Sequence, residues 1–217
     1  MPISEVFNRD CLEAMKEYPD NHFSLACVDP PYGIGNFVQT SGNVRGEPVE
    51  WNDAIPTQEF FYDLIRVSVN QIIWGANYYN CFPSIGGAII WDKDQPMPNF
   101  SKAEIASCSF HKKVEIYRQR WTNYVNTKET THPCEKPTDL YKWLLTNYAK
   151  PGDTILDTHL GSGSSRIAAY DLGFDFTGYE LDKDYFEAQE ERFARHIAQA
   201  KLFDAPVLET VDQESLF

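Results

Sequence analysis

The sequence has no apolar run that approaches the roughly 18 to 20 residues of a membrane-spanning helix. Its first residues, MPISEVFNRD, contain neither the basic start nor the apolar stretch of a secretion signal. We therefore expect a cytoplasmic protein that stays where it is made.

Metal-binding and disulfide patterns are also missing. The five cysteines are odd in number, and no two of them are spaced as Cys-x-x-Cys. The five histidines match no spacing of metal ligands. We therefore expect reduced thiols and no bound metal, which excludes a zinc cluster and a disulfide-stapled secreted domain.

Positive charge is scarce, because 19 basic residues stand against 32 acidic ones and the net charge is −13. A uniformly acidic surface repels nucleic acid. Between His111 and Lys128, however, there are five basic residues and one acid, Glu115. These five are Lys112, Lys113, Arg118, Arg120 and Lys128. We predict that Lys112, Lys113, Arg118 and Arg120 bind DNA, although an ordinary solvated face explains the same pattern as well.

A chain of 217 residues, 42% of them hydrophobic, suits one domain with one core. Strand-like and helix-like segments alternate, which predicts a three-layer α/β fold around a mostly parallel sheet. We expect this domain over 1–203, with a polar loop at 38–52, an insert at 93–131 and an acidic tail at 204–217. The insert is expected to be irregular, with a strand-like piece in VEIYRQRW at 114–121. The expected strands are 5–7, 22–28, 71–74, 87–91, 154–157 and 174–179. The expected helices are 10–18, 57–70, 137–148, 164–172 and 184–201.

A glycine-containing loop follows the strand that ends at Asp157. Gly161 and Gly163 let the backbone turn tightly and let a ligand approach, and a helix from Ser164 presents its first amides to that ligand. Glu180 ends the next strand, where it can accept hydrogen bonds from ribose hydroxyls. The third glycine of the dinucleotide motif is replaced by Arg166. The loop therefore predicts a nucleoside cofactor without phosphates, although a plain βα turn has the same glycines.

The tetrapeptide Asp29-Pro30-Pro31-Tyr32 follows the buried strand at 22–28. The prolines fix the backbone, so the Asp29 carboxylate and the Pro30 carbonyl form a rigid pair of hydrogen-bond acceptors. Tyr32 offers a flat ring on which a planar base can stack. An exocyclic amino group bound to both acceptors would present its nitrogen lone pair for transfer of a methyl group. A proline turn alone is common, so this interpretation depends on the nearby glycine loop.

Taken together, these segments resemble the beta class of amino-methylating DNA methyltransferases, particularly small phage-type adenine methylases. The matching segments, in chain order, are NRDCL at 8–12, DPPYG at 29–33, QIIWGANY at 71–78, HPCEKP at 132–137, DTHLGSG at 157–163 and GYELD at 178–182. The catalytic motif precedes the cofactor loop, which is the permuted motif order of that class.

The resemblance implies a Rossmann-like fold that binds S-adenosylmethionine and methylates adenine N6 in DNA after flipping the base. It implies that Asp29, Pro30 and Tyr32 form the target-base site. It implies cofactor contacts from Asp10 and Cys11 near the donor's adenine, from Lys136 near its methionine end, and from Asp29, Asp157, His159, Gly161, Gly163, Ser164 and Glu180. The segment 93–131 would recognise the target sequence.

Two departures weaken parts of this expectation. The family often has Pro-Phe where this chain has Thr158-His159, so a polar ring replaces an aromatic wall beside the cofactor. The recognition segment is short, which argues against strict sequence specificity and is compatible with a homodimer. The sequence identifies no recognition site and no partner restriction endonuclease.

Several other functions stay open on the residues alone. N4-cytosine methylation uses the same amino chemistry, although its enzymes more often begin the tetrapeptide with Ser. RNA in place of DNA is a further alternative, as is a non-catalytic module that binds nucleic acid. C5-cytosine methylation through Cys134 is disfavoured because no Glu-Asn-Val partner segment exists. Hydrolysis by paired carboxylates is disfavoured because no second acid lies near Asp29 in the sequence.

Overall fold

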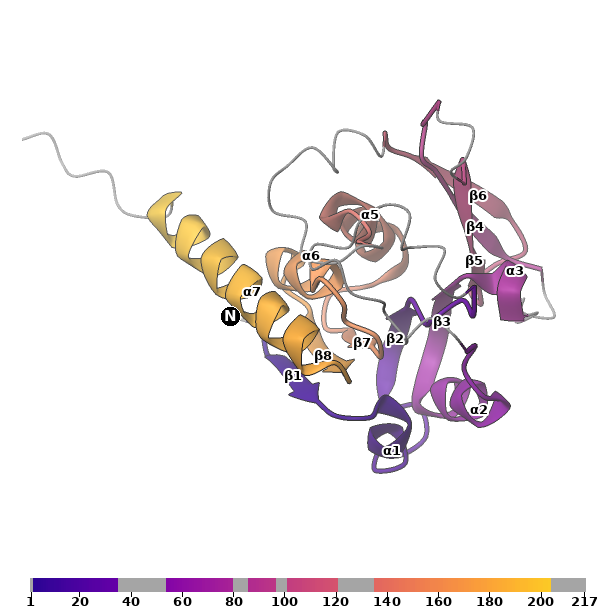
Figure 1. Ribbon diagram of the computed structural model, residues 1–217, viewed down its shortest axis with the longest axis horizontal. Helices are drawn as coiled ribbons and strands as arrows, with labels where there is room; N and C mark the ends of the chain where they lie inside the picture. The colour runs from indigo at the N-terminus through magenta and orange to yellow at the C-terminus, as the bar shows by residue number, and fades with distance from the viewer. Residues whose placement is uncertain (1, 35–53, 80–85, 97–100, 121–134, 204–217) are drawn as a thin grey trace, which may run out of the picture.

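The computed structural model describes residues 2–34, 54–79, 86–96, 101–120 and 135–203 (Figure 1). The loop expected at 38–52, the tail expected at 204–217, Cys134 and Lys128 lie outside these residues. None of the described helices is long and apolar enough to cross a membrane.

One sheet of eight strands forms the middle of the described structure, in the order β1-β8-β7-β2-β3-β5-β4-β6. The strands are β1 Ser4–Asn8, β2 Phe23–Val28, β3 Ser68–Trp74, β4 Ala88–Asp92, β5 Ala103–Cys108, β6 Val114–Arg118, β7 Thr154–Asp157 and β8 Asp175–Glu180. Within this sheet β5 pairs antiparallel with both β3 and β4, and every other pairing is parallel. The predicted mostly parallel sheet is therefore confirmed.

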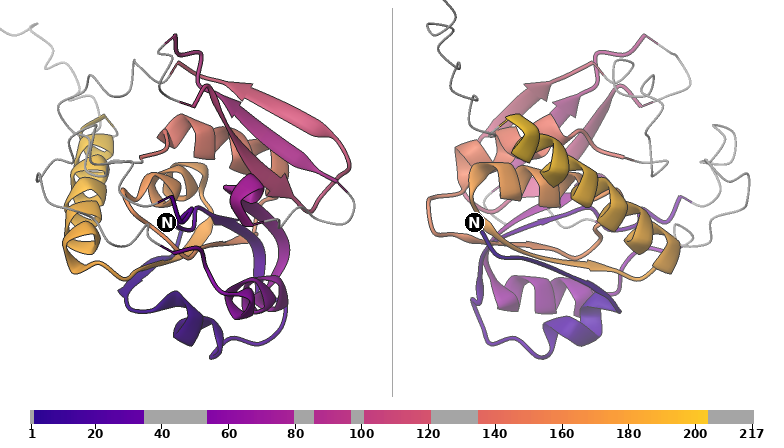
Figure 2. Two further views of the ribbon diagram at one scale, coloured as in Figure 1. Left: turned by 45° about the vertical axis from the view of Figure 1, so that its right-hand side comes forward. Right: turned by 90° about the vertical axis from the view of Figure 1, so that its left-hand side faces the viewer.

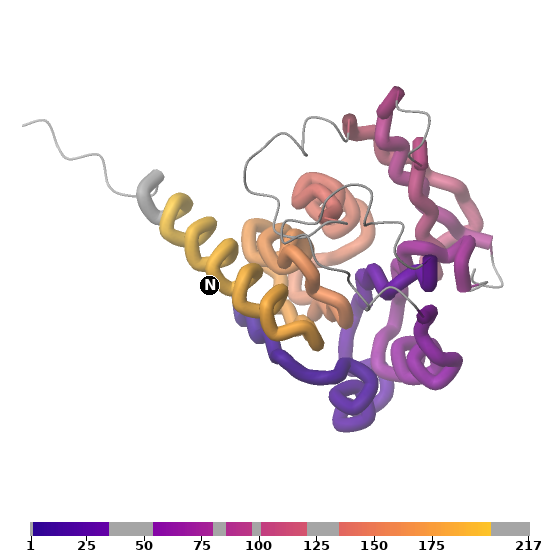
Figure 3. The backbone as a smooth tube through the Cα atoms, viewed as in Figure 1, coloured from indigo at the N-terminus to yellow at the C-terminus, as the bar shows by residue number. Residues whose placement is uncertain are grey.

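Helices cover both faces of this sheet (Figures 1 and 3). The helices are α1 Cys11–Met15, α2 Gln58–Val67, α3 Ala76–Tyr79, α5 Thr138–Tyr148, α6 Ser164–Leu172 and α7 Lys183–Phe203. Leu140 and Leu144 of α5 pack with Ala168 of α6 in a core on one face. Met15 of α1 and Leu64 of α2 pack in a second core on the other face. This arrangement is the predicted three-layer α/β fold.

The long helix α7 contacts β1, β8 and α6 (Figure 2). Arg166 of α6, at the position of the missing third glycine, is buried against this helix. Its guanidinium hydrogen-bonds Gln189 and Glu190 and lies 3.8 Å from the centre of the Phe193 ring. A side chain therefore fills the space that a glycine leaves in the dinucleotide motif.

Several predicted elements have the bounds expected of them. Strand 154–157 and helix 164–172 are found as predicted. The ends of the strands expected at 5–7, 22–28, 87–91 and 174–179 each differ from the prediction by at most one residue. The helix that the sequence places at 10–18 is shorter, because α1 ends at Met15.

The helix predicted at 57–70 is wrong at its end. Its buried face is formed by Phe60, Leu64 and Val67, and the backbone becomes extended at Ser68. Ser68 then pairs with Phe23 as the first residue of β3. Val69, which continues the helical spacing in the sequence, lies in that strand and is 55% exposed. Strand pairing with β2 therefore overrides the helical pattern.

The segment after Pro96 is more regular than expected: the strand-like piece expected at 114–121 is confirmed as β6, whereas the strand at 103–108 was not predicted. Residues 103–108 form β5, which inserts between β3 and β4, and residues 114–118 form β6 at the edge of the sheet. The described part of the segment 93–131 thus extends the main sheet. Its role in target recognition stays a prediction.

Candidate active site

The carboxyl ends of the parallel strands bring the predicted site residues to one edge of the sheet. Asp29 follows β2, Asp157 ends β7 and Glu180 ends β8. Because β2 lies between β3 and β7, Asp29 is placed next to the strand that leads into the glycine loop. Ligands of open α/β sheets bind at this edge.

Asp29 is hydrogen-bonded through both carboxylate oxygens. The Tyr32 hydroxyl donates to Oδ1 at 2.7 Å, and the Lys136 ammonium is ion-paired with Oδ2. The same ammonium donates to the Tyr32 hydroxyl at 3.0 Å. Lys136 was expected near the methionine end of the cofactor, whereas the structure places its ammonium on the carboxylate expected to bind the target base.

A second carboxylate, that of Glu104, completes this cluster. Glu104 Oε2 lies 2.9 Å from Lys136 Nζ, and its other oxygen is ion-paired with Lys93. Glu104 is the second residue of β5 and pairs with Trp91 of β4. Because β5 runs opposite to its neighbours, its first residues lie at the edge where the parallel strands end.

The charges in this cluster depend on one another. Burial opposes ionisation of Glu104, but the Lys136 and Lys93 charges outweigh this effect and lower the pKa of Glu104 to about 2. Burial raises the pKa of Asp29, and Glu104 adds to the rise, whereas Lys136 opposes it. Burial alone would lower the pKa of Lys136, but the two carboxylates raise it above its ordinary value. The two acids therefore favour the charged form of Lys136.

Two tyrosines that follow β3 hold the tetrapeptide. The Tyr78 ring is stacked on the Tyr32 ring, with centroids 4.9 Å apart and planes 16° apart. The Tyr79 hydroxyl donates a hydrogen bond of 2.7 Å to the Pro30 carbonyl. Gly75 makes this close approach possible, because a Cβ on it would lie 2.4 Å from both the Tyr32 ring and the Tyr79 hydroxyl.

The glycine loop is held by Asp157 and Glu180, two of the four carboxylates predicted to contact the cofactor. Glu180 accepts hydrogen bonds from the backbone N–H of Gly161 at 2.8 Å and of Asp182 at 2.9 Å. Asp157 accepts from the backbone N–H of His159 and from the Ser165 hydroxyl, at 3.0 and 2.5 Å. Gly161 adopts the left-handed conformation, with φ of 51°.

A side chain of α7 holds the start of α6 in place. Gly163 is the N-cap of α6 with φ of 75°. Arg192 of α7 donates to the Ser162 carbonyl at 2.8 Å and to the Ser164 hydroxyl at 2.9 Å. The same guanidinium is ion-paired with Glu135 at 2.8 Å. Arg192 therefore connects the glycine loop to the residue that precedes Lys136.

Burial disfavours the charged form of several groups near this loop. It lowers the pKa of His159 to about 4 and raises the pKa of the Cys11 thiol to about 12. It also raises the pKa of Asp157 to about 7. The His159 ring packs edge-on against Phe60, with centroids 5.4 Å apart. His159, which we expected to replace an aromatic wall with a polar ring, is thus an uncharged ring that packs against another aromatic ring.

These residues fit a nucleoside that carries no phosphate. Glu180 uses one acceptor site on each oxygen for the backbone, which leaves lone pairs for ribose hydroxyls. Asp157 places a second carboxyl group beside the loop, and Arg192 has its charge paired with Glu135. The acids here would repel a pyrophosphate, whereas they would not repel a cationic sulfonium compound.

The predicted cofactor residues lie along one edge of the sheet, because Asp10 and Cys11 follow β1, whose last residue Asn8 pairs with Glu180. Asp157, His159, Gly161, Gly163, Ser164 and Glu180 come together at the carboxyl edge of β7 and β8. Asp10 acts as the N-cap of α1, where its carboxylate accepts from the backbone N–H of Leu12 at 2.7 Å. Cys11 begins that helix.

The four basic residues predicted to bind DNA do not form one cluster. Lys112 and Lys113 precede β6, whereas Arg118 ends it and Arg120 follows it. The strand separates the two pairs by roughly 16 Å at about 3.3 Å per residue. Arg118 is ion-paired with Asp92 at 2.9 Å.

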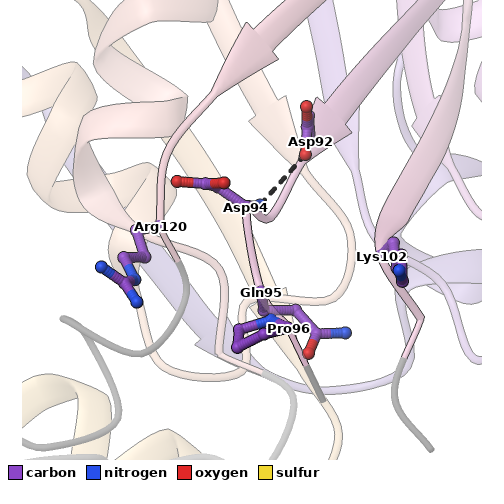
Figure 4. A pocket seen from close by; sticks show the side chains of 6 residues that line it. All are labelled: Asp92, Asp94, Gln95, Pro96, Lys102 and Arg120. Carbon is purple, nitrogen blue, oxygen red and sulfur yellow. Dashed lines mark hydrogen bonds between the residues drawn. The ribbon is translucent and has the colours of Figure 1, made fainter. Parts of the chain in front are cut away.

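Arg120 lies at a pocket of about 410 Å³ beyond the end of β4 (Figure 4). The pocket is lined by Asp92, Asp94, Gln95, Pro96, Lys102 and Arg120. Figure 4 shows Arg120 and Lys102 on opposite sides of Gln95 and Pro96. All of its lining residues except Asp92 belong to the segment 93–131 that is expected to recognise the target, and the pocket presents both donors and acceptors.

Sequence reasoning missed four residues of the site: Gly75, Tyr78, Tyr79 and Glu104. The segment QIIWGANY contains Gly75 and Tyr78, but the resemblance to a family implied no role for either residue. Glu104 carries no signal in the sequence, because its place depends on the reversed direction of β5.

Comparisons with known proteins agree with this geometry. Residues 109–191 match the model of a DNA methylase family, N6_N4_Mtase. The type II methyltransferase M.HinfI of Haemophilus influenzae is 22% identical over 88% of this chain and 68% of that protein. The type II methyltransferase M2.MboI of Moraxella bovis is 23% identical over 87% of this chain and 86% of that protein.

Solved structures share the fold. The complex of M1.HpyAVI with S-adenosylmethionine superposes with a TM-score of 0.59 and 18% identity, over 87% of this chain and 98% of that one. The cytosine-N4-specific PvuII DNA methyltransferase superposes with a TM-score of 0.60 and 14% identity, over 94% of this chain and 92% of that one. The chain is thus similar in sequence to DNA methylases of the N6/N4 type over residues 109–191 and to two type II methyltransferases over most of its length, and it shares the fold of solved DNA methyltransferases.

Proposed function

We propose that this chain is an S-adenosylmethionine-dependent methyltransferase that acts on the exocyclic amino group of a base in DNA, with adenine N6 as the target. One observation carries the proposal. The Asp29 carboxylate and the Pro30 carbonyl lie at the end of β2, beside the strand that leads into the glycine loop. An acceptor pair for an amino group thus adjoins a site that suits a nucleoside cofactor.

The donor would be held by the glycine loop and its two carboxylates. Glu180 would accept hydrogen bonds from ribose hydroxyls, and Gly161 and Gly163 would allow the donor to approach the backbone. Asp10 and Cys11 stay predicted contacts of the donor's adenine. When bound, S-adenosylmethionine supplies an electrophilic methyl group, so the protein needs to supply orientation and hydrogen bonds.

The target base would be read by its amino group. Asp29 and the Pro30 carbonyl would accept its two N–H bonds, which favours a tetrahedral nitrogen with an available lone pair. The stacked rings of Tyr32 and Tyr78 would support the plane of the base. The base must leave the duplex to reach this edge, at a cost of a few kcal/mol. Contacts from Arg118 and Arg120 to phosphates would offset part of that cost.

N4-cytosine is the second candidate target. Its amino group presents the same two N–H donors, and the likeness to the cytosine-N4-specific PvuII enzyme supports it. Adenine stays the first choice because the tetrapeptide begins with Asp29. The type II names of the two relatives support a partner restriction endonuclease, and a homodimer stays a prediction.

The test is a methylation assay with labelled S-adenosylmethionine and unmethylated DNA, followed by mass spectrometry of the nucleosides. We expect N6-methyladenine from the wild type and at least a roughly hundredfold lower rate from Asp29→Asn. Asp20→Asn is the matched control, because this 73% exposed side chain precedes β2 at its opposite end. N4-methylcytosine would change the base and keep the chemistry. Donor and DNA binding without any methylated nucleoside, on DNA or RNA, would indicate a binding module.

A further inference from the structure

Two acids of the site share one lysine. The Lys136 side chain is 3% exposed, and its ammonium contacts Asp29, Glu104 and the Tyr32 hydroxyl. An ammonium has three N–H donors, so these three oxygens use all of them. Lys136 therefore has fixed partners, and each acid receives part of its charge.

The cluster continues to a fourth charged group. Lys93 follows β4 and is ion-paired with the oxygen of Glu104 that Lys136 does not contact. The order Lys93, Glu104, Lys136, Asp29 thus alternates in sign and sums to zero. Removing one member of a buried ion-paired set leaves an uncompensated charge. The state of Asp29 should therefore respond to Glu104, to which it is connected through Lys136. The Tyr32 hydroxyl also connects them, because it lies 2.7 Å from Asp29 Oδ1 and 3.2 Å from Glu104 Oε2.

The proposed reaction makes two opposing demands on Asp29. In a buried site the carboxylate needs a nearby cation to stay ionised. The same carboxylate must still accept a hydrogen bond from the target amino group, with which a fully committed ammonium would compete.

We propose that Glu104 is a positioning residue that shares the Lys136 ammonium with Asp29 by accepting one of its three N–H bonds. Lys136 then keeps Asp29 ionised without occupying all of its lone pairs, so that Asp29 can still accept a hydrogen bond from the target amino group. The part of this proposal that concerns the target amino group rests on the function proposed above, whereas the sharing of Lys136 does not. Glu104 itself would touch neither base nor donor.

Substitutions of Lys136 and of Glu104 should then shift the titration midpoint of Asp29 in opposite directions. In Lys136→Met, Asp29 loses its cation and keeps the repulsion of Glu104, so its titration midpoint should rise by about one to three pH units. In Glu104→Gln, the repulsion is lost and Lys136 has Asp29 as its remaining acid, so the midpoint should fall by about one pH unit. The double variant should lie between the two.

The measurement is a carbon-13 NMR titration of the Asp29 carboxyl group in the full chain, assigned with Asp29→Asn. The groups that contact Asp29 or sense its charge are Lys136, Glu104, Tyr32, Cys27, Tyr141 and Asp157, with Lys93 acting through Glu104. Lys142→Met is the matched control, because it breaks an ion pair with Asp171 between α5 and α6. It should leave the Asp29 midpoint unchanged.

Single-turnover methylation, with enzyme in excess over a short DNA duplex, tests whether the sharing of Lys136 helps Asp29 to accept the target amino group. At pH 7.5 we expect Glu104→Gln to be about tenfold slower than wild type, and Glu104→Asp to recover part of the rate. Circular dichroism and donor binding establish that each variant is folded.

An Asp29 midpoint that Glu104→Gln leaves unchanged or raises would overturn the proposal. So would opposite shifts accompanied by an unchanged rate in an active enzyme, because positioning would then have no consequence. Opposite shifts in a protein whose wild type methylates nothing would support the shared lysine and overturn the proposed function alone.

Discussion

The Tyr79 hydroxyl donates a 2.7 Å hydrogen bond to the Pro30 carbonyl, the same oxygen that we propose as an acceptor for the target amino group. A carbonyl oxygen has two lone pairs, so it can accept from both donors. Tyr79 therefore orients the carbonyl without excluding a base from it.

Tyr79→Phe removes this orienting bond and keeps the ring. A hydrogen bond of this kind contributes about 1 kcal/mol, which corresponds to roughly a fivefold slower methyl transfer. Donor affinity should not change, because Tyr79 lies on the β3 side of Asp29. Single-turnover rates and donor titrations check both expectations, and a weakened donor affinity with an unchanged rate would contradict them.

Gly75→Ala should disrupt the aromatic support of the tetrapeptide. A Cβ would lie 2.4 Å from both the Tyr32 ring and the Tyr79 hydroxyl, at a residue whose φ is 75°. We expect a loss of at least about 1 kcal/mol in the free energy of unfolding from the backbone alone, and a large loss of methylation.

Gly152→Ala is the control for this variant. Its φ is 91°, but no atom lies within 4 Å of the added Cβ. It should therefore show the backbone cost without the loss of methylation. Urea unfolding and methylation assays compare the two, and equal effects on activity would show that the contact with the tyrosines is unimportant.

His159 should make the stability of the protein depend on pH. Burial lowers the pKa of His159 from 6.5 to about 4 in the folded state, so the unfolded chain binds an extra proton between these values. Its contribution to stability is therefore complete above pH 6.5 and is lost as the pH falls towards 4.

His159→Phe should remove this contribution, because phenylalanine does not titrate. The opposite contribution of Asp157, whose pKa burial raises to about 7, should remain in both proteins. The measurement is the free energy of unfolding in urea at several pH values from 4 to 7, for wild type and variant. The exposed His22, changed to Gln, serves as the control. A variant whose stability falls towards pH 4 as steeply as that of the wild type would refute the assignment to His159.

The two pairs of basic residues around β6 should contribute differently to DNA binding. Arg118 and Arg120 lie at the end where β4 and β6 approach the pocket, whereas Lys112 and Lys113 lie before the strand. Changing both arginines to Glu should weaken binding more and should reduce the slope of affinity against salt by about one for each lost phosphate contact.

Fluorescence anisotropy of a labelled duplex across a salt series measures both pairs. The double lysine variant, Lys112→Glu with Lys113→Glu, carries the same change in net charge. Equal weakening by the two variants would mean that overall charge, and not position, determines affinity.

The sequence predicted those parts of the fold that local patterns specify. The strand at 154–157, the glycine turn and the helix from Ser164 follow from β-branched and apolar residues, from glycine conformations and from helix spacing within about twenty residues. The same local patterns placed Asp29 at a strand end.

The remaining features depend on contacts between distant segments. Val69 continues a helical spacing, yet pairing of β3 with β2 makes it part of a strand. Lys136 was assigned to the cofactor by resemblance, and its ion pair with Asp29 joins residues that are 107 positions apart. Glu104 needs the reversed strand to reach the site, and nothing in its neighbourhood in the sequence indicates that reversal.

The reversed strand also determines where this architecture can accept new sequence. Both ends of the connection between Asp92 and Ala103 lie at the edge that holds Asp29, and the strands on either side are fixed by five registered pairs. A longer loop grafted between β4 and β5 would therefore emerge beside the proposed base site without shifting the sheet. The connection is a natural place to engineer a new target specificity on an unchanged catalytic edge.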